Sequence, residues 1–269
     1  MSDAMRLKIT HTTRYIFDDP VIYGLQQLRK TPKNSHQQTV LYWTTVVEGG
    51  RKEVTFEDHH NNTVDLISFE KEVTELVVQC TGEVQLEDTN GVVGLHRGPA
   101  PLWLFRRATK RTKPGQGCRG IVRLVEGEGE LDRLHALSGI ILEKVPYKVG
   151  VSHAGWTAEE AVAEGAGVCQ DHAHIFVACA REMGIPARYV SGYLMMDGLT
   201  QQEASHAWAE AYVEGLGWVG FDVSNEICPD ERYVRVATGL DYDEAAPVRG
   251  SRQGGSGEAL SVQIEVAQQ

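Results

Sequence analysis

The spacing of apolar residues changes near residue 115, and this change is what most constrains the fold. Before it, polar and apolar residues alternate in short runs such as "MRLKITHTTRYIF" and "TVDLISFE", with turn residues such as "HHNN" between them. Short strands with tight turns predict an antiparallel β-sandwich over residues 1–115. Pro, Gly and basic residues then accumulate in "GPAPLWLFRRATKRTKPGQG", where we place a domain boundary.

Residues 116–269 mix helical and strand patterns, which predicts an α+β core that runs to the C-terminus. "ELDRLHALSGIILEKV" has helical spacing, and "TAEEAVAEG" opens on a capping box of Thr157 and Glu160 and stops at Gly165. A further helix follows in "GAGVCQDHAHIFVACAREMGIP". Strands return in "ARYVSGYLMM", "HAWAEAYVE" and "WVGFDVS", and "RGSRQGGSGEAL" predicts a flexible loop before a final strand, "SVQIEV".

Charge and cysteine content exclude several classes of protein. The formal net charge of −11 argues against a general nucleic-acid binder, and the basic stretch at residues 105–117 is typical of a solvated linker. The N-terminus has no secretion signal pattern, and no apolar run is long enough to span a membrane. The five dispersed cysteines form no C-x-x-C pair, so we expect reduced thiols, a cytoplasmic location and neither a metal nor another cofactor.

Cys169 is the candidate nucleophile, because it stands between a glycine-rich turn and the start of a helix. Unpaired N–H groups and the helix dipole place partial positive charge there, which favours a thiolate. The same N–H groups could hold a developing oxyanion. Cys179, in the middle of the same helix, is expected to be a small buried apolar residue.

His206 is the candidate base, since a thiolate needs a partner that takes and returns protons. It begins a strand after a polar loop. If its strand and the next form a hairpin whose paired residue numbers sum to an even value, Asp222 lies diagonally from His206 on the same face and can orient the ring. Spacing alone leaves open a structural cysteine and an ordinary surface pair of His206 and Asp222.

The stretches "GAGVCQDHAHIFVACAREMGIPARYVSGYL" and "SHAWAEAYVEGLGWVGFDVSN" resemble the core of bacterial transglutaminase-like proteins, a family often described as cysteine proteases. The β-rich N-terminal part and the C-terminal ending are also similar to that family. The resemblance implies a papain-like α+β core with Cys169 as nucleophile, His206 as base and Asp222 as orienter. In "FDVSN", Val223 and Ser224 stand where the family usually has proline and threonine. Gln170 is adjacent to the nucleophile, but the second oxyanion donor is not assigned.

The leading hypothesis is acyl transfer through a thioester on Cys169, with a peptide, protein or amide as substrate. Hydrolysis is favoured over transamidation, because nothing in the sequence indicates an amine-binding site. One alternative is a catalytically silent peptide-binding module of the same fold. Another is a metal site at Asp171, His172 and His174, although consecutive and alternate helix positions do not converge on one ion. We expect neither nucleic acid nor a membrane as a partner.

Overall fold

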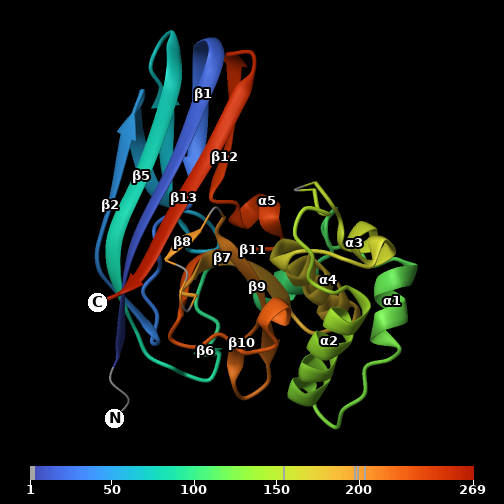
Figure 1. Cartoon of the computed structure of the whole chain (residues 1–269). Helices are drawn as coiled ribbons and strands as arrows, with labels where there is room; N and C mark the ends of the chain where they lie inside the picture. Colours follow the sequence, from blue (N-terminus) through green and yellow to red (C-terminus); the bar gives the residue numbers. More distant parts are fainter. Residues whose placement is uncertain (1–3, 154, 197, 199, 203) are drawn as a thin grey trace.

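The computed structural model describes residues 4–153, 155–196, 198, 200–202 and 204–269. It contains two antiparallel sheets, one of eight strands and one of five, with the helices gathered beside the smaller sheet (Figure 1). The eight-stranded sheet comprises β1 (Met5–Leu28), β2 (Gln38–Glu48), β3 (Gly50–Glu57), β4 (Thr63–Phe69), β5 (Val73–Leu86), β8 (Gln201–Gln202), β12 (Val248–Gly254) and β13 (Glu258–Gln268).

The long strand β1 holds the eight-stranded sheet together. Its first half lies between β5 and β13, and its last residues pair with β4 and β12. The pairing with β5 shifts register between Ile16 and Val21, where Pro20 lacks an N–H for the ladder. The strands that were expected to form a sandwich thus share one hydrogen-bonded sheet, which encloses a core around Phe17, Ile67 and Leu76.

The C-terminal segment differs from its prediction. Residues 249–260 were predicted as a loop, but residues 249–254 belong to β12 and residues 258–260 to β13, which leaves only residues 255–257 between the two strands. Gly254, Gly255 and Gly257 have φ values of 80°, 67° and 55°, which side chains rarely adopt. Both β12 and β13 pair with β1 instead of with the core sheet. The boundary at residue 115 stays a prediction, but the last two strands complete the N-terminal sheet.

The second sheet and the helices form the core region. The strand order is β11-β7-β9-β10-β6. Its strands are β6 (Val92–Gly94), β7 (Ala187–Leu194), β9 (His206–Val213), β10 (Gly217–Phe221) and β11 (Tyr233–Gly239). The helices are η1 (Leu102–Arg106), α1 (Gln116–Val122), α2 (Glu130–Lys144), α3 (Ala158–Glu164), α4 (Cys169–Glu182), η2 (Val223–Asn225) and α5 (Tyr242–Ala245). None of the helices in the described part of the chain is both long and apolar enough to cross a membrane.

Helix α4 is the central element of the core. It packs on the small residues of β9, where Ala209 and Ala211 let the backbones approach closely. Helices α1, α2 and α3 cover its other sides (Figure 1), so most of its residues are buried, including Cys179 as expected. Helix α3 begins with the predicted capping box of Thr157 and Glu160 and ends at Gly165, whose φ is 70°.

The basic stretch at 105–117 is more ordered than the linker that was predicted. The side chain of Phe105 is buried against Trp218, and Arg111 forms an ion pair with Asp243 at 2.9 Å. Residues from 116 onward already belong to α1. The buried Phe105 and the ion pair of Arg111 therefore hold this segment against the core, although its composition is typical of a solvated linker.

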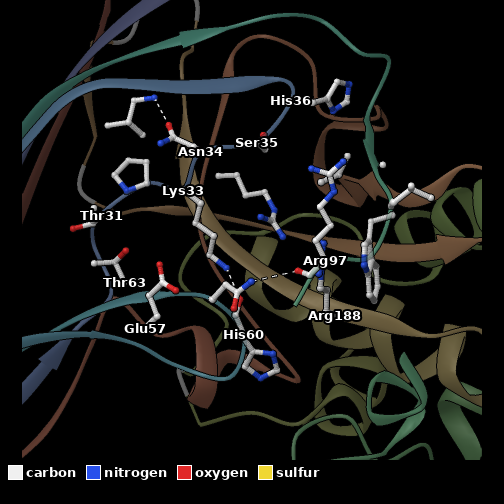
Figure 2. Close-up of a pocket in the computed structure, with 18 of the residues that line it drawn as sticks. Thr31, Lys33, Asn34, Ser35, His36, Glu57, His60, Thr63, Arg97 and Arg188 are labelled. Atoms are coloured by element: carbon white, nitrogen blue, oxygen red, sulfur yellow. Dashed lines mark hydrogen bonds between the residues drawn. The ribbon is translucent and has the colours of Figure 1, made fainter. Parts of the chain in front are cut away.

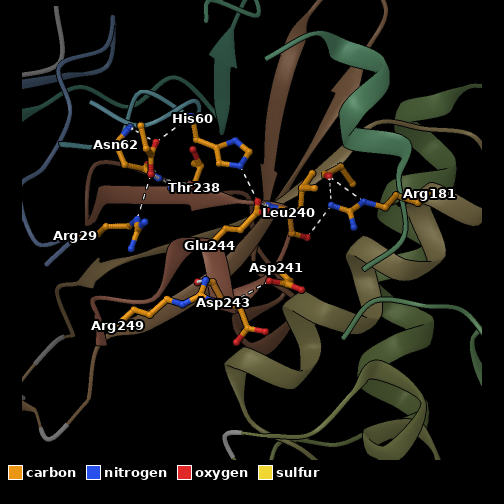
Figure 3. Close-up of polar contacts among 12 residues, drawn as sticks. Arg29, His60, Asn62, Arg181, Thr238, Leu240, Asp241, Asp243, Glu244 and Arg249 are labelled. Atoms are coloured by element: carbon orange, nitrogen blue, oxygen red, sulfur yellow. Dashed lines mark hydrogen bonds and ion pairs between the residues drawn. The ribbon is translucent and has the colours of Figure 1, made fainter. Parts of the chain in front are cut away.

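Polar contacts join the two sheets (Figure 3). The amide of Asn62, in the turn after β3, donates to the Thr238 carbonyl oxygen at 2.8 Å and accepts from the Thr238 N–H at 2.9 Å. His60 Nε2 lies 2.7 Å from a carboxylate oxygen of Glu244. Leu7 and Ile9 of β1 also pack in one apolar cluster with residues of β7 and β11. The N-terminal sheet is thus fixed against the core sheet near its edge strand β11.

Glu210 is a fully buried carboxylate between two arginines. Its oxygens accept from Arg188 Nε and Arg235 Nε, each at 2.6 Å. Burial alone would raise the pKa of Glu210, but the charges of Arg188 and Arg235 outweigh it and lower the pKa to about 2. This carboxylate therefore stabilises the fold above its unfolded-state pKa of about 4.3, and the contribution is lost as the pH falls toward 2.

Replacing Glu210 with glutamine should lower the free energy of unfolding by about 3–5 kcal/mol, because two guanidinium groups would stay buried without their carboxylate. Urea unfolding at pH 7 measures the change. Glu214→Gln, at an exposed position after β9, is the control and should stay within about 0.5 kcal/mol of the wild type. A loss below about 1 kcal/mol for Glu210→Gln would show that the arginines find other partners.

Candidate active site

Cys169 is the first residue of α4, and the preceding turn has a fixed shape. The Asp171 carboxylate accepts from the Val168 N–H at 2.9 Å. Gly167 lies so close to Asp171 that a Cβ there would come within 2.9 Å of the Asp171 Cβ. The first bond of the helix runs from the His172 N–H to the Val168 carbonyl, so the N–H of Cys169 precedes the helical ladder. The thiol is half-buried at the positive end of the helix.

The structure brings His206 and Asp222 to Cys169. Strands β9 and β10 pair Gly217 with Val213 and Phe221 with Ala209, so paired residue numbers sum to an even value, as the predicted arrangement requires. His206 Nε2 lies 2.6 Å from Asp222 Oδ2, and the ring interacts with the Cys169 thiol through a side-chain hydrogen bond and by charge. Because Asp222 engages Nε2, Nδ1 is the ring nitrogen that remains for Cys169.

Asp222 is held by four donors and is 1 % exposed. Its Oδ2 accepts from His206, from Asn225 Nδ2 at 2.7 Å and from the Tyr233 hydroxyl at 2.7 Å, and its Oδ1 accepts from the Ser224 N–H at 3.0 Å. Burial acts to raise the pKa of Asp222, but the hydrogen bond and charge of His206 and the other donors outweigh it and lower the pKa. The carboxylate is therefore ionised and cannot turn away from the ring without losing these bonds.

The same contacts set the charge of His206. Burial acts to lower the pKa of the ring, but hydrogen bonds to Asp222 and Cys169 and the charges of both raise it to about 10. The folded-state pKa thus exceeds the unfolded value of about 6.5. The interaction stabilises the fold fully below pH 6.5, and its contribution is lost as the pH rises through about 10.

In a pH titration followed by NMR of ¹⁵N-labelled histidine, the His206 ring should keep its proton well above pH 7. His172 provides an internal control in the same spectrum, because burial lowers its pKa and should leave it neutral at pH 7. In His206 the two ring nitrogens should report the imidazolium form up to about pH 10. A His206 midpoint near 6.5 would contradict the ion pair with Asp222.

The histidines of α4 do not form a metal site with Asp171. His172 Nε2 donates to the Val145 carbonyl at 2.7 Å, so its Nδ1 accepts from the Ser224 hydroxyl at 2.8 Å. His174 Nε2 instead accepts from the Tyr242 N–H at 3.1 Å. Adjacent and alternate helix positions point these side chains to different neighbours, and the two rings act as buried polar links within the fold.

Sequence reasoning missed three side chains of this site. Tyr233 reaches Asp222 from β11, which no local pattern indicates. Asn225 follows Asp222 by three residues at the end of a strand, a turn-like spacing that could have indicated it. Trp208 stacks beside His206 with ring centroids 6.2 Å apart. Cys169, His206 and Asp222, the three residues predicted from the sequence, lie together in space. Their catalytic roles stay predictions.

Two regions of the sequence match known protein families. Residues 120–223 match the transglutaminase-like superfamily, and residues 7–85 match the bacterial transglutaminase-like N-terminal region. An uncharacterized protein of Mycobacterium leprae (strain TN) is 27% identical over 278 residues, which cover 97% of this chain and 98% of the relative. An uncharacterized protein of Mycobacterium tuberculosis (strain ATCC 25618 / H37Rv) is 27% identical over 281 residues, covering 93% and 88%.

A solved structure shares the whole fold. It is that of a Cytophaga hutchinsonii protein described as a candidate cysteine protease, with a TM-score of 0.80 and 22% identity, covering 99% of this chain and 91% of that one. At this identity the likeness concerns the fold, which combines helices with a large share of strand. The two matched regions show that this chain belongs to the transglutaminase-like superfamily, with a bacterial transglutaminase-like N-terminal region before the core.

Proposed function

We propose that this protein is a thiol enzyme that cleaves a peptide or amide bond through a thioester on Cys169. The observation that carries the proposal is the continuous contact from Cys169 through His206 to the buried carboxylate of Asp222. A nucleophile, a base and a group that orients the base are the three parts that such chemistry needs. The helix start beside the strand histidine also supports a papain-like arrangement of the core.

The first half-reaction forms the thioester. The Cys169 thiolate attacks the carbonyl carbon, and the carbonyl π electrons move to the oxygen, near the N–H groups at the start of α4. When the tetrahedral intermediate collapses, the C–N bond breaks and imidazolium His206 gives its proton to the leaving amine. Asp222 holds the ring in place throughout by its hydrogen bond to Nε2.

The second half-reaction releases the acyl group. Neutral His206 takes a proton from water as the water oxygen attacks the thioester carbon. The C–S bond then breaks, and a carboxylic acid leaves while the thiolate and imidazolium pair is restored. A primary amine in place of water would give transamidation by the same steps. Hydrolysis is the form we propose, with a peptide, protein or amide as the partner.

The state of the other thiols supports this assignment and a reducing, cytoplasmic setting. All five cysteines are free, and Cys80, Cys118 and Cys179 are buried. Burial raises the pKa of Cys80 and of the half-buried Cys228, which makes these two thiols less reactive. Cys169 is therefore the thiol whose surroundings favour attack on a carbonyl carbon.

Trapping of the acyl-enzyme tests the proposal. The purified chain would be incubated with a library of peptide and amide substrates, with and without added primary amines, and its intact mass would be followed after rapid acid quench. We expect an acyl adduct on Cys169, located by peptide mapping, and release of the free acid without amine. In the same preparation, iodoacetamide should label Cys169 before the other four cysteines. No adduct with any substrate, together with uniform labelling of the exposed thiols, would favour a silent binding module.

A further inference from the structure

A cavity of about 1120 Å³ lies between the N-terminal sheet and the core sheet (Figure 2), and Cys169 is not among the residues that line it. One wall is the segment after β1, which includes Lys33 and His36, and another is the segment around β6, which includes Arg97. Arg188, Trp218 and Arg235 of the core sheet also line it. Ligand sites in proteins usually measure about 300–1,000 Å³, so this cavity has room for more than a single ion.

The cavity is positively charged although the chain as a whole carries −11. Its described lining contains four lysine and arginine side chains, Lys33, Arg97, Arg188 and Arg235, against the carboxylate of Glu57. Buried Glu210 adds one negative charge, which it shares between Arg188 and Arg235. Two positive charges are thus left over when Lys33 is protonated.

Lys33 is a part-buried amine whose two hydrogen-bond partners are uncharged. Its ammonium group donates to the His60 carbonyl at 2.8 Å and to the Thr238 hydroxyl at 3.0 Å, and no carboxylate of the described residues forms an ion pair with it. Burial, with repulsion from Arg235 and Arg188, lowers the pKa of Lys33 well below its ordinary value. An anion beside this group would relieve that repulsion and favour its protonated form.

Arg188 is fixed in position and presents its terminal amino groups. Its guanidinium carbon lies 3.8 Å from the centroid of the Trp218 ring, and its Nε donates to Glu210. Among the described residues, no acceptor takes a hydrogen bond from the two terminal amino groups of Arg188. A guanidinium held flat in this way is suited to carboxylate or phosphate oxygens, which it can bind in pairs.

We propose that this cavity binds a small soluble molecule with at least two anionic groups, either carboxylates or phosphates. Two groups are required because the cations come from separate segments: Lys33 follows β1, Arg97 follows β6 and Arg188 lies in β7. The site is distinct from the catalytic one: along β9, Glu210 is four residues from His206, a distance of about 13 Å. The proposal therefore does not depend on the thioester chemistry.

Isothermal titration calorimetry of the full chain tests the proposal, with inorganic pyrophosphate and tricarballylate as separate probes at low salt. We expect at least one probe to bind, and the comparison of the two decides between phosphate and carboxylate. If neither probe binds at about 1 mM, or only a Glu-rich peptide binds, the small-anion proposal is wrong.

Matched variants test which side chains bind the anionic probe. Arg97→Gln and Lys33→Met should each weaken it about 10-fold or more, the effect of losing one charge-assisted hydrogen bond. Arg107→Gln removes an exposed arginine that lies outside the lining and should bind like the wild type. Cys169→Ala should also bind unchanged, which separates this proposal from the proposed enzyme activity. Because Arg97 is exposed, its variant should fold normally, and wild-type affinity in Arg97→Gln and in a folded Lys33→Met would overturn the assignment.

Discussion

Replacing Cys169 with alanine should reduce turnover of the amide or peptide substrate by about 10⁶-fold, the scale of the loss when a serine enzyme loses its nucleophile. The reason is that His206 and Asp222 supply no nucleophile that could take the acyl group in place of Cys169. The N–H groups at the start of α4 stabilise an oxyanion, but the oxyanion forms only after a nucleophile has attacked. What activity is left should come from binding and from those N–H groups. Turnover of the substrate found in the library screen measures the loss.

Cys228→Ala is the matched control for this result. Cys228 is half-buried and free like Cys169, but it follows β10 and contacts Gly91, outside the site. Its variant should keep wild-type turnover. Because the Cys169 side chain is half-buried at a helix end, Cys169→Ala should also keep its cooperative thermal unfolding. If folded Cys169→Ala kept more than about 1% of the wild-type turnover, the nucleophile would lie elsewhere.

Local patterns predicted the elements that carry the site. A glycine-rich turn before an apolar stripe placed the start of α4 at Cys169, because the N-terminal residue of a helix is determined by its immediate neighbours. The hairpin of β9 and β10 turns at Gly215 and Gly217, whose φ values are 84° and 85°, and such a tight glycine turn between two strand patterns is a local signal. Once that hairpin is given, its register alone sets which residues share a face with His206.

Long-range pairing was beyond the sequence. The alternating pattern of β1 predicts a strand, but nothing in it shows that β12 and β13, more than 200 residues later, pair with the same strand. Tyr233 reaches Asp222 only because β11 joins the edge of the core sheet. The cationic cavity has the same origin, since Lys33 and Arg235 are distant in sequence and meet where the two sheets pack. Sequence spacing predicts contacts within a hairpin or a helix, not between sheets.

The end of β10 shows why the departure from the family pattern leaves Asp222 in place. Val223, where the family usually has proline, is 2% exposed and packs in the helical core. Ser224 donates its N–H to Asp222 and its hydroxyl to His172. Burial of one side chain and two hydrogen bonds from the next thus fix the strand end, a task for which proline would use its rigid ring.

Asp222→Asn should lower turnover by about 10² to 10³-fold, less than the 10⁴-fold loss in a serine triad, because the His206 ring, with its pKa raised to about 10, already carries its proton before attack. Both oxygens of Asp222 accept hydrogen bonds, so an amide must turn its NH₂ group toward donors on one side. If that side is Oδ2, it faces His206, Asn225 and Tyr233; if it is Oδ1, it faces the Ser224 N–H. The His206 titration should move to lower pH together with the loss of turnover, which a purely structural defect would not cause.

Tyr233→Phe is the control, because it removes one donor and leaves the carboxylate, and it should lose only a few-fold in turnover. Full activity in Asp222→Asn, with an unmoved His206 titration, would reduce the site to a dyad of Cys169 and His206.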